Sequence, residues 1–336
     1  MNQKILVTGG AGYVGGALVK ELVERGYKVR VVDKLIFGEK PLSFIKNKIE
    51  LIKADIRKVN SNILKGIDAI IHLAGISTEP TAQFDPRLTD LINHIATERL
   101  AKLAKKKGIK RFIFASSCSV YFTYNTPLFP KPSKETEKVN PISPYSISKR
   151  SAEQALLELA SDSFHPIIFR KGTIYGLSPK MRYDLVLNSF VKDSFLQRKM
   201  TVHCSGQIWR PLIDIKDVIW AYIRALELPA KKIGGKIFNV SDKNWNILEL
   251  AKEVKKILKK EKGIDPEIHV EPVGITRNYQ ADNTLFRKTF EYKPQRRLKD
   301  AILEIWNHLE KNPKDPLDTI HYNDKWLIPL IEAGKI

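Results

Sequence analysis

The stretch Ile5-Leu6-Val7-Thr8-Gly9-Gly10-Ala11-Gly12-Tyr13-Val14-Gly15 decides the fold of this chain. An apolar run leads directly into glycines at positions 9, 12 and 15, and an amphipathic helical pattern follows. Glycines at this spacing allow a tight turn, let a pyrophosphate approach bare backbone, and let the helix pack closely on its strand. The positive end of the helix then faces the phosphates. The pattern predicts a strand–turn–helix cradle for a dinucleotide, with Gly10 offering a second register that shares Gly12 and Gly15.

A carboxylate follows at the distance that such a cradle requires. The second apolar run, residues 29–32, ends at Asp33, where a carboxylate can accept a hydrogen bond from a ribose 2′-hydroxyl. This favours NAD as the cofactor. Lys34 leaves NADP as an alternative, because a cation beside the ribose can attract a 2′-phosphate.

Strand-like and helix-like segments alternate through the first 171 residues. We predict an α/β fold with a Rossmann-type, doubly wound parallel sheet and a smaller mixed α/β C-terminal substrate lobe. The expected boundaries are 1–171 for the NAD-binding domain and 172–336 for the substrate-binding lobe. Strands are expected near 3–8, 28–33, 49–54, 68–74, 110–116 and 166–171, and helices near 12–25, 56–65, 85–107 and 143–160.

The second half of the chain has a looser pattern. We expect a helix near 182–198, and strands near 209–214 and 236–240 that return to the first domain. Residues 122–144 are rich in Pro, Thr, Ser and Lys, which predicts a long functional loop. The residues after Pro313 look peripheral.

Composition excludes several classes of protein. A chain of 336 residues can bury a sizeable core unaided, and its only cysteines, Cys118 and Cys204, are isolated, which favours a reducing cytoplasm. No apolar run has the length of a signal peptide core or a membrane span, so no membrane partner is expected. The formal charge of +20 is spread along the chain rather than gathered, so we expect no nucleic-acid partner. No histidines have metal-ligand spacing, and no metal is expected.

Tyr145 and Lys149 form the most reactive pair. They lie four residues apart near the start of a helix that Ser143 or Pro144 opens, so their side chains share one face. A nearby ammonium lowers the pKa of a phenol, which would let Tyr145 exchange a proton near neutrality. About thirty residues upstream, the apolar strand 111–115 ends in the hydroxyls Ser116 and Ser117, and the ends of such strands are where α/β sheets place ligands.

With these residues in place, the chain resembles the extended short-chain dehydrogenase/reductase family, in particular its NAD-dependent nucleotide-sugar epimerases and dehydratases, of the UDP-glucose 4-epimerase type. The resemblance covers nearly the whole chain. Its motifs are Thr8-Gly9-x-x-Gly12-x-x-Gly15, Asp33, Asp55-Ile56, His72-Leu73-Ala74, Asn93, Ser116-Ser117-x-x-Val120-Tyr121, Ser143-Pro144-Tyr145-x-x-x-Lys149, and Arg210-Pro211-Leu212-Ile213 followed by Asp217.

The resemblance implies roles for individual residues. Ser117, Tyr145 and Lys149 would be the catalytic triad. Cofactor contacts would come from Gly9, Gly12, Tyr13, Val14, Gly15, Asp33, Lys34, Asp55, Ile56, Leu73, Ala74, Gly75, Asn93, Tyr145 and Lys149. The nucleotide sugar would be bound by Ser119, Thr173, Asn188, Arg210 and Arg277, with the two arginines on its pyrophosphate. The family resemblance also implies a homodimer through the helices near 85–107 and 143–160.

Three departures from the family pattern bear on the reaction. Dehydratases and decarboxylases of the family carry acidic residues just after the Ser/Thr, where this chain has Cys118 and Ser119. Members that epimerise at C3 and C5 place a cysteine at the position of Ser119, whereas Cys118 is one residue off and is expected to be a small buried side chain. Phe122 stands where the family usually has glycine. His72 ends a buried strand, so we expect a core or cofactor-side role for it.

These observations predict an NAD-dependent epimerase that acts at C4 of a UDP- or dTDP-hexose through a transient 4-keto intermediate. The alternatives within the family are a 4-keto sugar reductase and a dehydratase. A different class of protein, a non-catalytic dinucleotide sensor, would have no need of the Tyr145–Lys149 pair.

Overall fold

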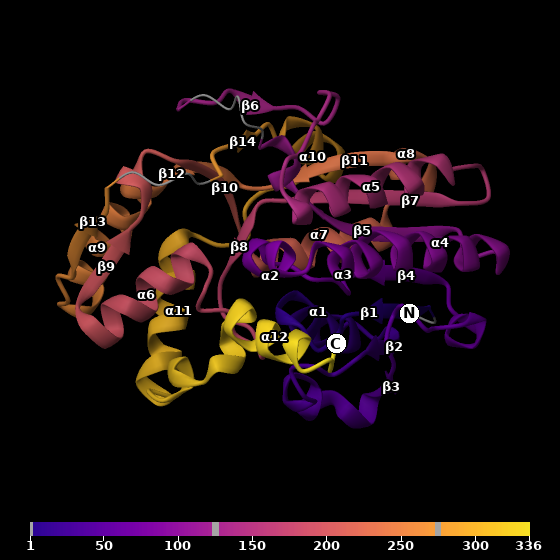
Figure 1. The fold of residues 1–336 in the computed structure, drawn as a ribbon, viewed down its shortest axis with the longest axis horizontal. Coiled ribbons are helices and arrows are strands. Elements are labelled where there is room, and N and C mark those ends of the chain that lie inside the picture. The colour runs from indigo at the N-terminus through magenta and orange to yellow at the C-terminus, as the bar shows by residue number, and fades with distance from the viewer. Residues whose placement is uncertain (1–2, 123–127, 273–276) are drawn as a thin grey trace.

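Seven parallel strands form the centre of the molecule in the computed structural model, which describes residues 3–122, 128–272 and 277–336. Their spatial order is β11-β7-β5-β4-β1-β2-β3, the doubly wound arrangement that the sequence predicts (Figure 1). The strands are β1 (Lys4–Thr8), β2 (Lys28–Asp33), β3 (Ile49–Lys53), β4 (Ala69–His72), β5 (Arg111–Ser117), β7 (His165–Lys171) and β11 (Lys236–Val240).

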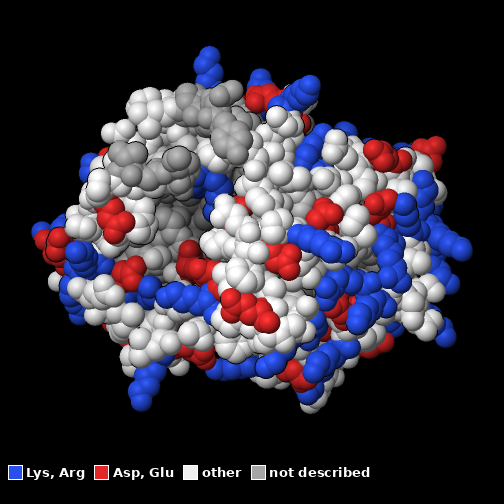
Figure 2. Space-filling model, in the orientation of Figure 1, with Lys and Arg blue, Asp and Glu red and all other residues white. Residues whose placement is uncertain are grey.

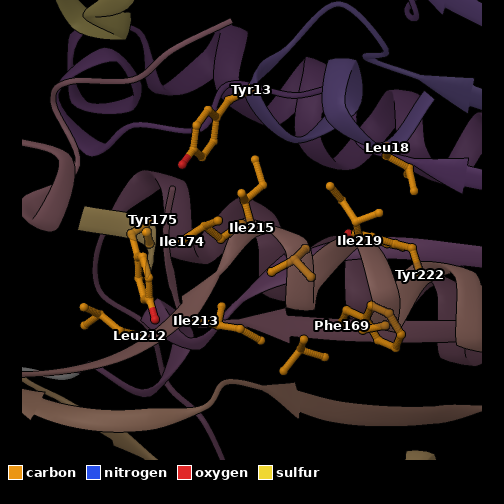
Figure 3. Close-up of a cluster of buried hydrophobic side chains, with 14 of the residues drawn as sticks. Tyr13, Leu18, Phe169, Ile174, Tyr175, Leu212, Ile213, Ile215, Ile219 and Tyr222 are labelled. Carbon is orange, nitrogen blue, oxygen red and sulfur yellow. The ribbon is translucent and has the colours of Figure 1, made fainter. Parts of the chain in front are cut away.

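Helices cover both faces of this sheet, and alternation along β1 assigns each side chain to a face. Ile5 and Val7 pack in one hydrophobic core and Leu6 in the other, as side chains that alternate along a strand must. The first core includes α1 (Tyr13–Glu24) and α7 (Ile215–Glu227), and Figure 3 shows Ile215, Ile219 and Tyr222 of α7 among residues of α1 and the strands. The second core includes α4 (Ala96–Lys106) and α5 (Pro144–Glu158).

Two predicted helices differ from the observed ones. The prediction of a helix over 56–65 is wrong, because only a short 3-10 turn, η2 (Ser61–Leu64), forms there. The segment 85–107 divides into α3 (Pro86–Asp90), a π-helical turn η3 (Leu91–Ile95) and α4. Such π turns often occur at functional sites because they re-aim the side chains they carry.

The C-terminal lobe combines small sheets with helices. A three-stranded sheet joins β12 (Lys243–Asn246), β10 (Trp209–Asp214) and β8 (Thr173–Tyr175), so residues 209–214 do not join the central sheet as expected, whereas 236–240 form its edge strand β11. Two-stranded sheets pair β9 (Lys199–Val202) with β13 (Glu267–Val270), and β6 (Pro132–Ser133) with β14 (Gln280–Ala281). Strand β6 lies in the expected loop 122–144, of which residues 123–127 fall outside the described part.

The remaining helices are α2 (Glu79–Phe84), α6 (Val186–Gln197), α8 (Ala230–Ile233), α9 (Ile247–Lys262), α10 (Thr284–Phe290), α11 (Leu298–Lys311) and α12 (Asn323–Glu332).

The expectation that residues after Pro313 are peripheral is wrong. Helix α12 packs against α2 of the first domain, and the Trp326 indole donates a hydrogen bond to the Ile36 carbonyl at 3.0 Å. Leu327 is buried there. Apolar periodicity in 323–331 was the available signal, but Trp326 and its partner Ile36 are separated by 290 positions in the sequence.

Among the described residues, no helix is long and apolar enough to cross a membrane. Figure 2 shows lysine and arginine side chains distributed over the visible face, interspersed with acidic ones.

Candidate active site

The turn after β1 requires glycine at two of the predicted positions. Gly9 has a φ of +73°, and a Cβ there would lie 2.6 Å from the Ala74 backbone nitrogen. A Cβ on Gly15 would lie 2.1 Å from the Gly9 carbonyl oxygen. Gly12 caps the start of α1 and has far fewer close neighbours. The backbone around Gly12 is therefore open to a ligand at the positive end of α1, as a dinucleotide pyrophosphate requires.

Asp33 is held in place at the end of β2. Its carboxylate accepts hydrogen bonds from the backbone N–H groups of Ala11 at 2.9 Å and Leu35 at 2.7 Å. Burial raises the pKa of Asp33, and these two hydrogen bonds lower it. Each carboxylate oxygen can accept more than one hydrogen bond, so Asp33 can still bind a ribose hydroxyl.

The cation beside Asp33 is already paired. The Lys34 ammonium lies 3.3 Å from Asp55, which also pairs with Arg57. Burial raises the pKa of Asp55, but the Arg57 and Lys34 contacts outweigh it and hold that pKa well below its usual range. Lys34 is therefore engaged by a carboxylate, which favours a ribose without a 2′-phosphate.

A cavity of about 600 Å³ runs from this turn across the carboxyl ends of the strands. Figure 2 shows the surface hollowed where the C-terminal lobe meets the sheet. Most of the predicted site residues line the cavity, namely Gly9, Gly12, Tyr13, Val14, Gly15, Asp33, Lys34, Asp55, Ile56, Leu73, Ala74, Gly75, Ser117, Tyr145, Thr173, Arg210 and Arg277. The fold thus brings predicted residues from both halves of the chain to one cavity.

Tyr145 and Ser117 meet at the centre of this cavity. Ser143 caps α5 and Pro144 opens it, which places Tyr145 in the first turn of the helix, beside the end of β5. Burial raises the pKa of Tyr145 to about 12, and a hydrogen bond with Ser117 and the charges of Arg277 and Arg182 lower it. The expectation of a phenol that titrates near neutrality is therefore not met in the protein without a cofactor.

Lys149 lies behind Tyr145 rather than on the cavity wall. Its ammonium is 5.0 Å from the centre of the Phe114 ring and 5.9 Å from that of Tyr145. Burial lowers the pKa of Lys149 to about 7, and the neighbouring Lys171 adds to that effect. At neutral pH this amine exchanges its proton readily, which suits a group that supports proton transfer.

A buried polar network fixes the end of β5. The Glu153 carboxylate accepts hydrogen bonds from Ser116 at 2.5 Å and from Arg170 at 2.9 and 2.7 Å. Arg170 also donates to the Tyr121 hydroxyl at 2.9 Å. All four side chains are buried, and Ser116 also lines the cavity, so the network holds the end of β5, including Ser117, against α5.

Asn93 forms hydrogen bonds with Ile76, a residue of the cavity wall. Its side chain accepts from the Ile76 N–H at 2.8 Å and donates to the Ile76 carbonyl at 2.9 Å. A Cβ on Gly75 would lie 2.7 Å from the Asn93 oxygen and 3.4 Å from the Lys149 ammonium nitrogen. Asn93 therefore orders the loop after β4, although it does not line the cavity.

Two residues assigned to the substrate do not reach the cavity. Ser119 is buried and accepts a hydrogen bond from the Ser146 hydroxyl at 2.9 Å. Asn188 is also buried, where it accepts from the Gly176 N–H at 3.0 Å and donates to the Arg182 carbonyl. Both assignments followed the family pattern, and local packing gives these side chains structural partners instead.

Cys118 and His72 are buried, and burial disfavours the charged form of each side chain. The Cys118 thiol donates to the Arg170 carbonyl at 3.1 Å, and burial raises its pKa. His72 contacts the hydroxyls of Thr8 at 2.6 Å and Thr97 at 2.8 Å, and burial lowers its pKa to about 3. Neither can serve as a thiolate or as an imidazolium acid at neutral pH.

The cavity contains further residues that the sequence analysis missed. The Arg182 guanidinium pairs with Asp184 at 2.7 Å, and the missed Tyr279 lies with its ring centre 4.9 Å from the guanidinium of the predicted Arg210. Burial lowers the pKa of Arg210 to about 10. The missed lining residues include Lys171, Lys180, Arg182, Asp184, Tyr279, Glu79 and Leu327. For Lys171 a signal existed, since it follows a buried strand just as Ser117 does.

No group of three His, Cys, Asp or Glu side chains within residues 3–122, 128–272 and 277–336 could hold a metal ion.

Known proteins resemble this chain over most of its length. An uncharacterised UDP-glucose epimerase of Bacillus subtilis is 28% identical over 323 residues, which cover 89% of this chain and 95% of that protein. UDP-glucuronic acid decarboxylase 1 of Arabidopsis thaliana is 32% identical over 280 residues, covering 80% of this chain but 60% of that protein.

Solved structures share the fold over nearly the whole chain. UDP-glucose 4-epimerase of Thermotoga maritima with UDP-glucose is 26% identical, with a TM-score of 0.79 over 93% of this chain and 100% of that one. UDP-glucuronic acid 4-epimerase of Bacillus cereus, in complex with UDP-glucuronic acid and NAD, is 25% identical, with a TM-score of 0.79 over 92% and 100%.

The sequence profile of the NAD dependent epimerase/dehydratase family matches residues 5–241. The predicted cofactor, NAD, agrees with that match and with the carboxylate at Asp33. The chain is a member of the NAD dependent epimerase/dehydratase family, the enzymes of the extended short-chain dehydrogenase/reductase type that modify sugar nucleotides.

Proposed function

We propose that this protein epimerises a nucleotide sugar at C4 through a transient 4-keto intermediate. The observation that carries the proposal is the hydrogen-bonded Ser117–Tyr145 pair, with a serine rather than an acid at position 119. The carboxylates that line the cavity are Asp33, Asp55, Glu79, Asp184 and Asp324. Asp33 ends β2, Asp55 follows β3 and Asp184 pairs with Arg182. Glu79 lies in α2 and Asp324 in α12, so none of the five carboxylates stands at the end of β5, where the family's second acid or base would be.

The residues around the turn after β1 would hold NAD, with Gly12 against its pyrophosphate and Asp33 on a ribose hydroxyl. When bound, NAD supplies reversible hydride acceptance at the sugar carbon. The charges of Arg277 and Arg182 lower the pKa of Tyr145, and the positive charge of oxidised NAD would add to this effect when the cofactor is bound.

In the proposed reaction Tyr145, as the phenolate, takes the proton of the C4 hydroxyl. Ser117 donates a hydrogen bond to the same sugar oxygen and then to the 4-keto oxygen. Lys149 stabilises the phenolate from behind. The ketone then presents its other face within the cavity, and Tyr145 returns the proton to the new C4 hydroxyl. Because one tyrosine serves both directions, the reaction needs no further base.

The paired state of Lys34 supports an epimerase over a reductase that consumes NADPH, since a 2′-phosphate would have to compete with Asp55 for this ammonium. The Ser119 side chain, bonded to Ser146, supports an epimerase over a dehydratase, whose elimination requires an acid/base at this strand end.

The purified protein loaded with NAD, mixed with UDP- or dTDP-hexoses, tests the proposal. We expect NMR to show a C4 epimer without added reductant and without net change in absorbance at 340 nm. Product that forms only in step with NADPH oxidation would replace the epimerase with a reductase, and a keto-deoxy sugar would replace it with a dehydratase. A protein that binds NAD but turns over no sugar would be the sensor.

We also propose a homodimer through η3, α4 and α5. Leu91, Ile95 and Ile147 are large apolar side chains on these elements and are 39, 43 and 45% exposed. Light scattering should give twice the mass of one chain, and the double substitution Ile95→Glu with Ile147→Glu should give a monomer. An unchanged mass after that substitution would contradict this interface.

A further inference from the structure

Lys171 occupies the sugar end of the cavity. It is the last residue of β7 and faces Ser117, the last residue of β5, in the register of the sheet. Residues that face one another in neighbouring parallel strands project on the same side, and both side chains line the cavity. Lys171 therefore lies one strand spacing from the serine assigned to the sugar oxygen.

This lysine has no counter-ion in the protein. Across the described ranges 3–122, 128–272 and 277–336, its ammonium makes neither a hydrogen bond nor an ion pair. Burial lowers the pKa of Lys171 to about 8, and the charge of Arg182 adds to that effect. The Lys171 side chain is half-buried on the cavity wall, and a cation that is partly removed from water costs free energy unless an anion pairs with it. A cavity that holds an unpaired ammonium is suited to a ligand with a negative charge at that place.

The cofactor phosphates cannot supply this charge. They are expected at Gly12, beside β1, and β7 is separated from β1 by both β5 and β4. Three strand spacings amount to about 14 Å. The pyrophosphate of the sugar nucleotide is expected at Arg210 and Arg277, the pair that the family resemblance implies for it, and both line the same cavity. Lys171 would then pair with a third anion.

We propose that Lys171 binds a carboxylate on the hexose ring, so that the substrate is a nucleotide sugar of the uronic-acid class. This inference rests on the proposed function, which puts the C4 hydroxyl at Tyr145 and Ser117. A uronic acid carries its carboxylate as C6, two bonds from C4, and Lys171 lies beside Ser117. Thr173, which also lines the cavity two residues further along, offers a hydroxyl on the same side.

The same ion pair would protect the 4-keto intermediate. A 4-keto uronate loses CO₂ when the C5–C6 bond breaks and its electron pair moves toward the C4 carbonyl oxygen. An ammonium paired with the carboxylate stabilises that charge before the bond breaks, and so slows the loss of CO₂. Lys171 would thus favour return of the intact uronate over decarboxylation.

Binding measurements test the inference independently of the reaction. UDP-glucuronate and UDP-glucose are titrated by calorimetry into NAD-loaded Tyr145→Phe protein, with and without Lys171→Met. We expect tighter binding of UDP-glucuronate, a loss of about 10- to 100-fold in its affinity on Lys171→Met, and a change below about 3-fold for UDP-glucose. Lys171→Arg should retain most of the preference, and Lys107→Met, an exposed lysine after α4, should change neither affinity.

Equal affinities for the two sugars, an equal loss of both on Lys171→Met, or binding of neither would overturn the inference. The outcome also separates it from the proposed function. Uronate preference through Lys171 without a C4 epimer would retain this inference and overturn the proposed function. Epimerisation of UDP-glucose by a protein that shows no uronate preference would do the reverse.

Discussion

The two ends of the cavity differ in how their charges are satisfied. At the cofactor end, Asp33 accepts two backbone N–H groups and Lys34 pairs with Asp55 before any ligand binds. At the sugar end, Lys171 has no hydrogen-bond or ion-pair partner among the described residues. Burial lowers the pKa of Lys149 and raises that of Tyr145, and both shifts favour the neutral side chain. The charged groups at the cofactor end are thus paired by the protein itself. We propose that ligands supply the missing partners at the sugar end.

The difference follows from what each end has to do. A cofactor that stays bound through the reaction is held best by groups whose positions are already fixed. A substrate that enters, changes configuration and leaves needs groups whose charge and proton can respond to it. Substitutions at the two ends should therefore have separable effects.

Tyr145→Phe should give the largest effect and should disable only the sugar end. Removal of the hydroxyl eliminates the acid/base, so we expect kcat to fall about 10³-fold while the affinity for NAD changes little. Steady-state kinetics and NAD titration measure the two quantities. Tyr27→Phe, a buried tyrosine remote from the cavity, is the control and should leave kcat within about 2-fold. Retained turnover in Tyr145→Phe would remove this residue from the mechanism.

Asp33→Ala should weaken the cofactor end instead. The substitution removes the acceptor for a ribose hydroxyl and for the Ala11 and Leu35 N–H groups, so NAD should bind about 10- to 100-fold more weakly. The preference for NAD over NADP should fall with it. Fluorescence titration with both dinucleotides measures this, with the exposed Asp162→Ala as control. An unchanged preference would mean that Asp33 does not contact the ribose.

Leu327→Ser tests whether α12 belongs to the cofactor end. Leu327 is 5% exposed and lines the cavity, whereas Leu317 is 67% exposed and serves as the matched control. Because the substitution removes buried apolar surface from the cavity wall, it should weaken NAD binding about 3- to 10-fold. The same change at position 317 should have no effect. Equal effects of the two substitutions on NAD binding would show that α12 does not contribute to the cofactor site.

Cys118→Ala should have the smallest effect, because this thiol belongs to neither end. It is fully buried and bonded to a carbonyl, so we expect kcat within about 3-fold and a loss of stability near 1 kcal/mol. Kinetics and urea unfolding measure the two. A loss of turnover without a loss of stability would give the thiol a chemical role.

The sequence predicted the cofactor end well because its signals are local. The glycines at 9, 12 and 15 and Asp33 lie on one strand–turn–helix–strand unit, and backbone geometry demands glycine at positions 9 and 15. The places of Tyr145, Lys149 and Ser117 could be predicted for a similar reason, since a helical turn and a strand end fix them, whereas their catalytic roles stay predictions.

The rest depended on contacts that sequence spacing does not reveal. Ser119 and Asn188 were assigned to the substrate, but Ser146 and Gly176 engage them in the interior. Lys171 was missed because its place at the end of a buried strand, the one signal it carries, does not single it out in a lysine-rich chain until its neighbours are known. The role of α12 depends on a surface that α2 and the loop after β2 provide. The pKa of Tyr145 was predicted from one neighbouring charge, whereas burial is the larger influence.

The path of the C4 hydrogen tests the central claim most directly. A UDP-sugar labelled with deuterium at C4 is incubated with the NAD-loaded protein, and the products are analysed by NMR and mass spectrometry. Epimerisation at C4 predicts that the new epimer keeps its deuterium at C4. Deuterium released to solvent, or recovered on another carbon of the sugar, would contradict it.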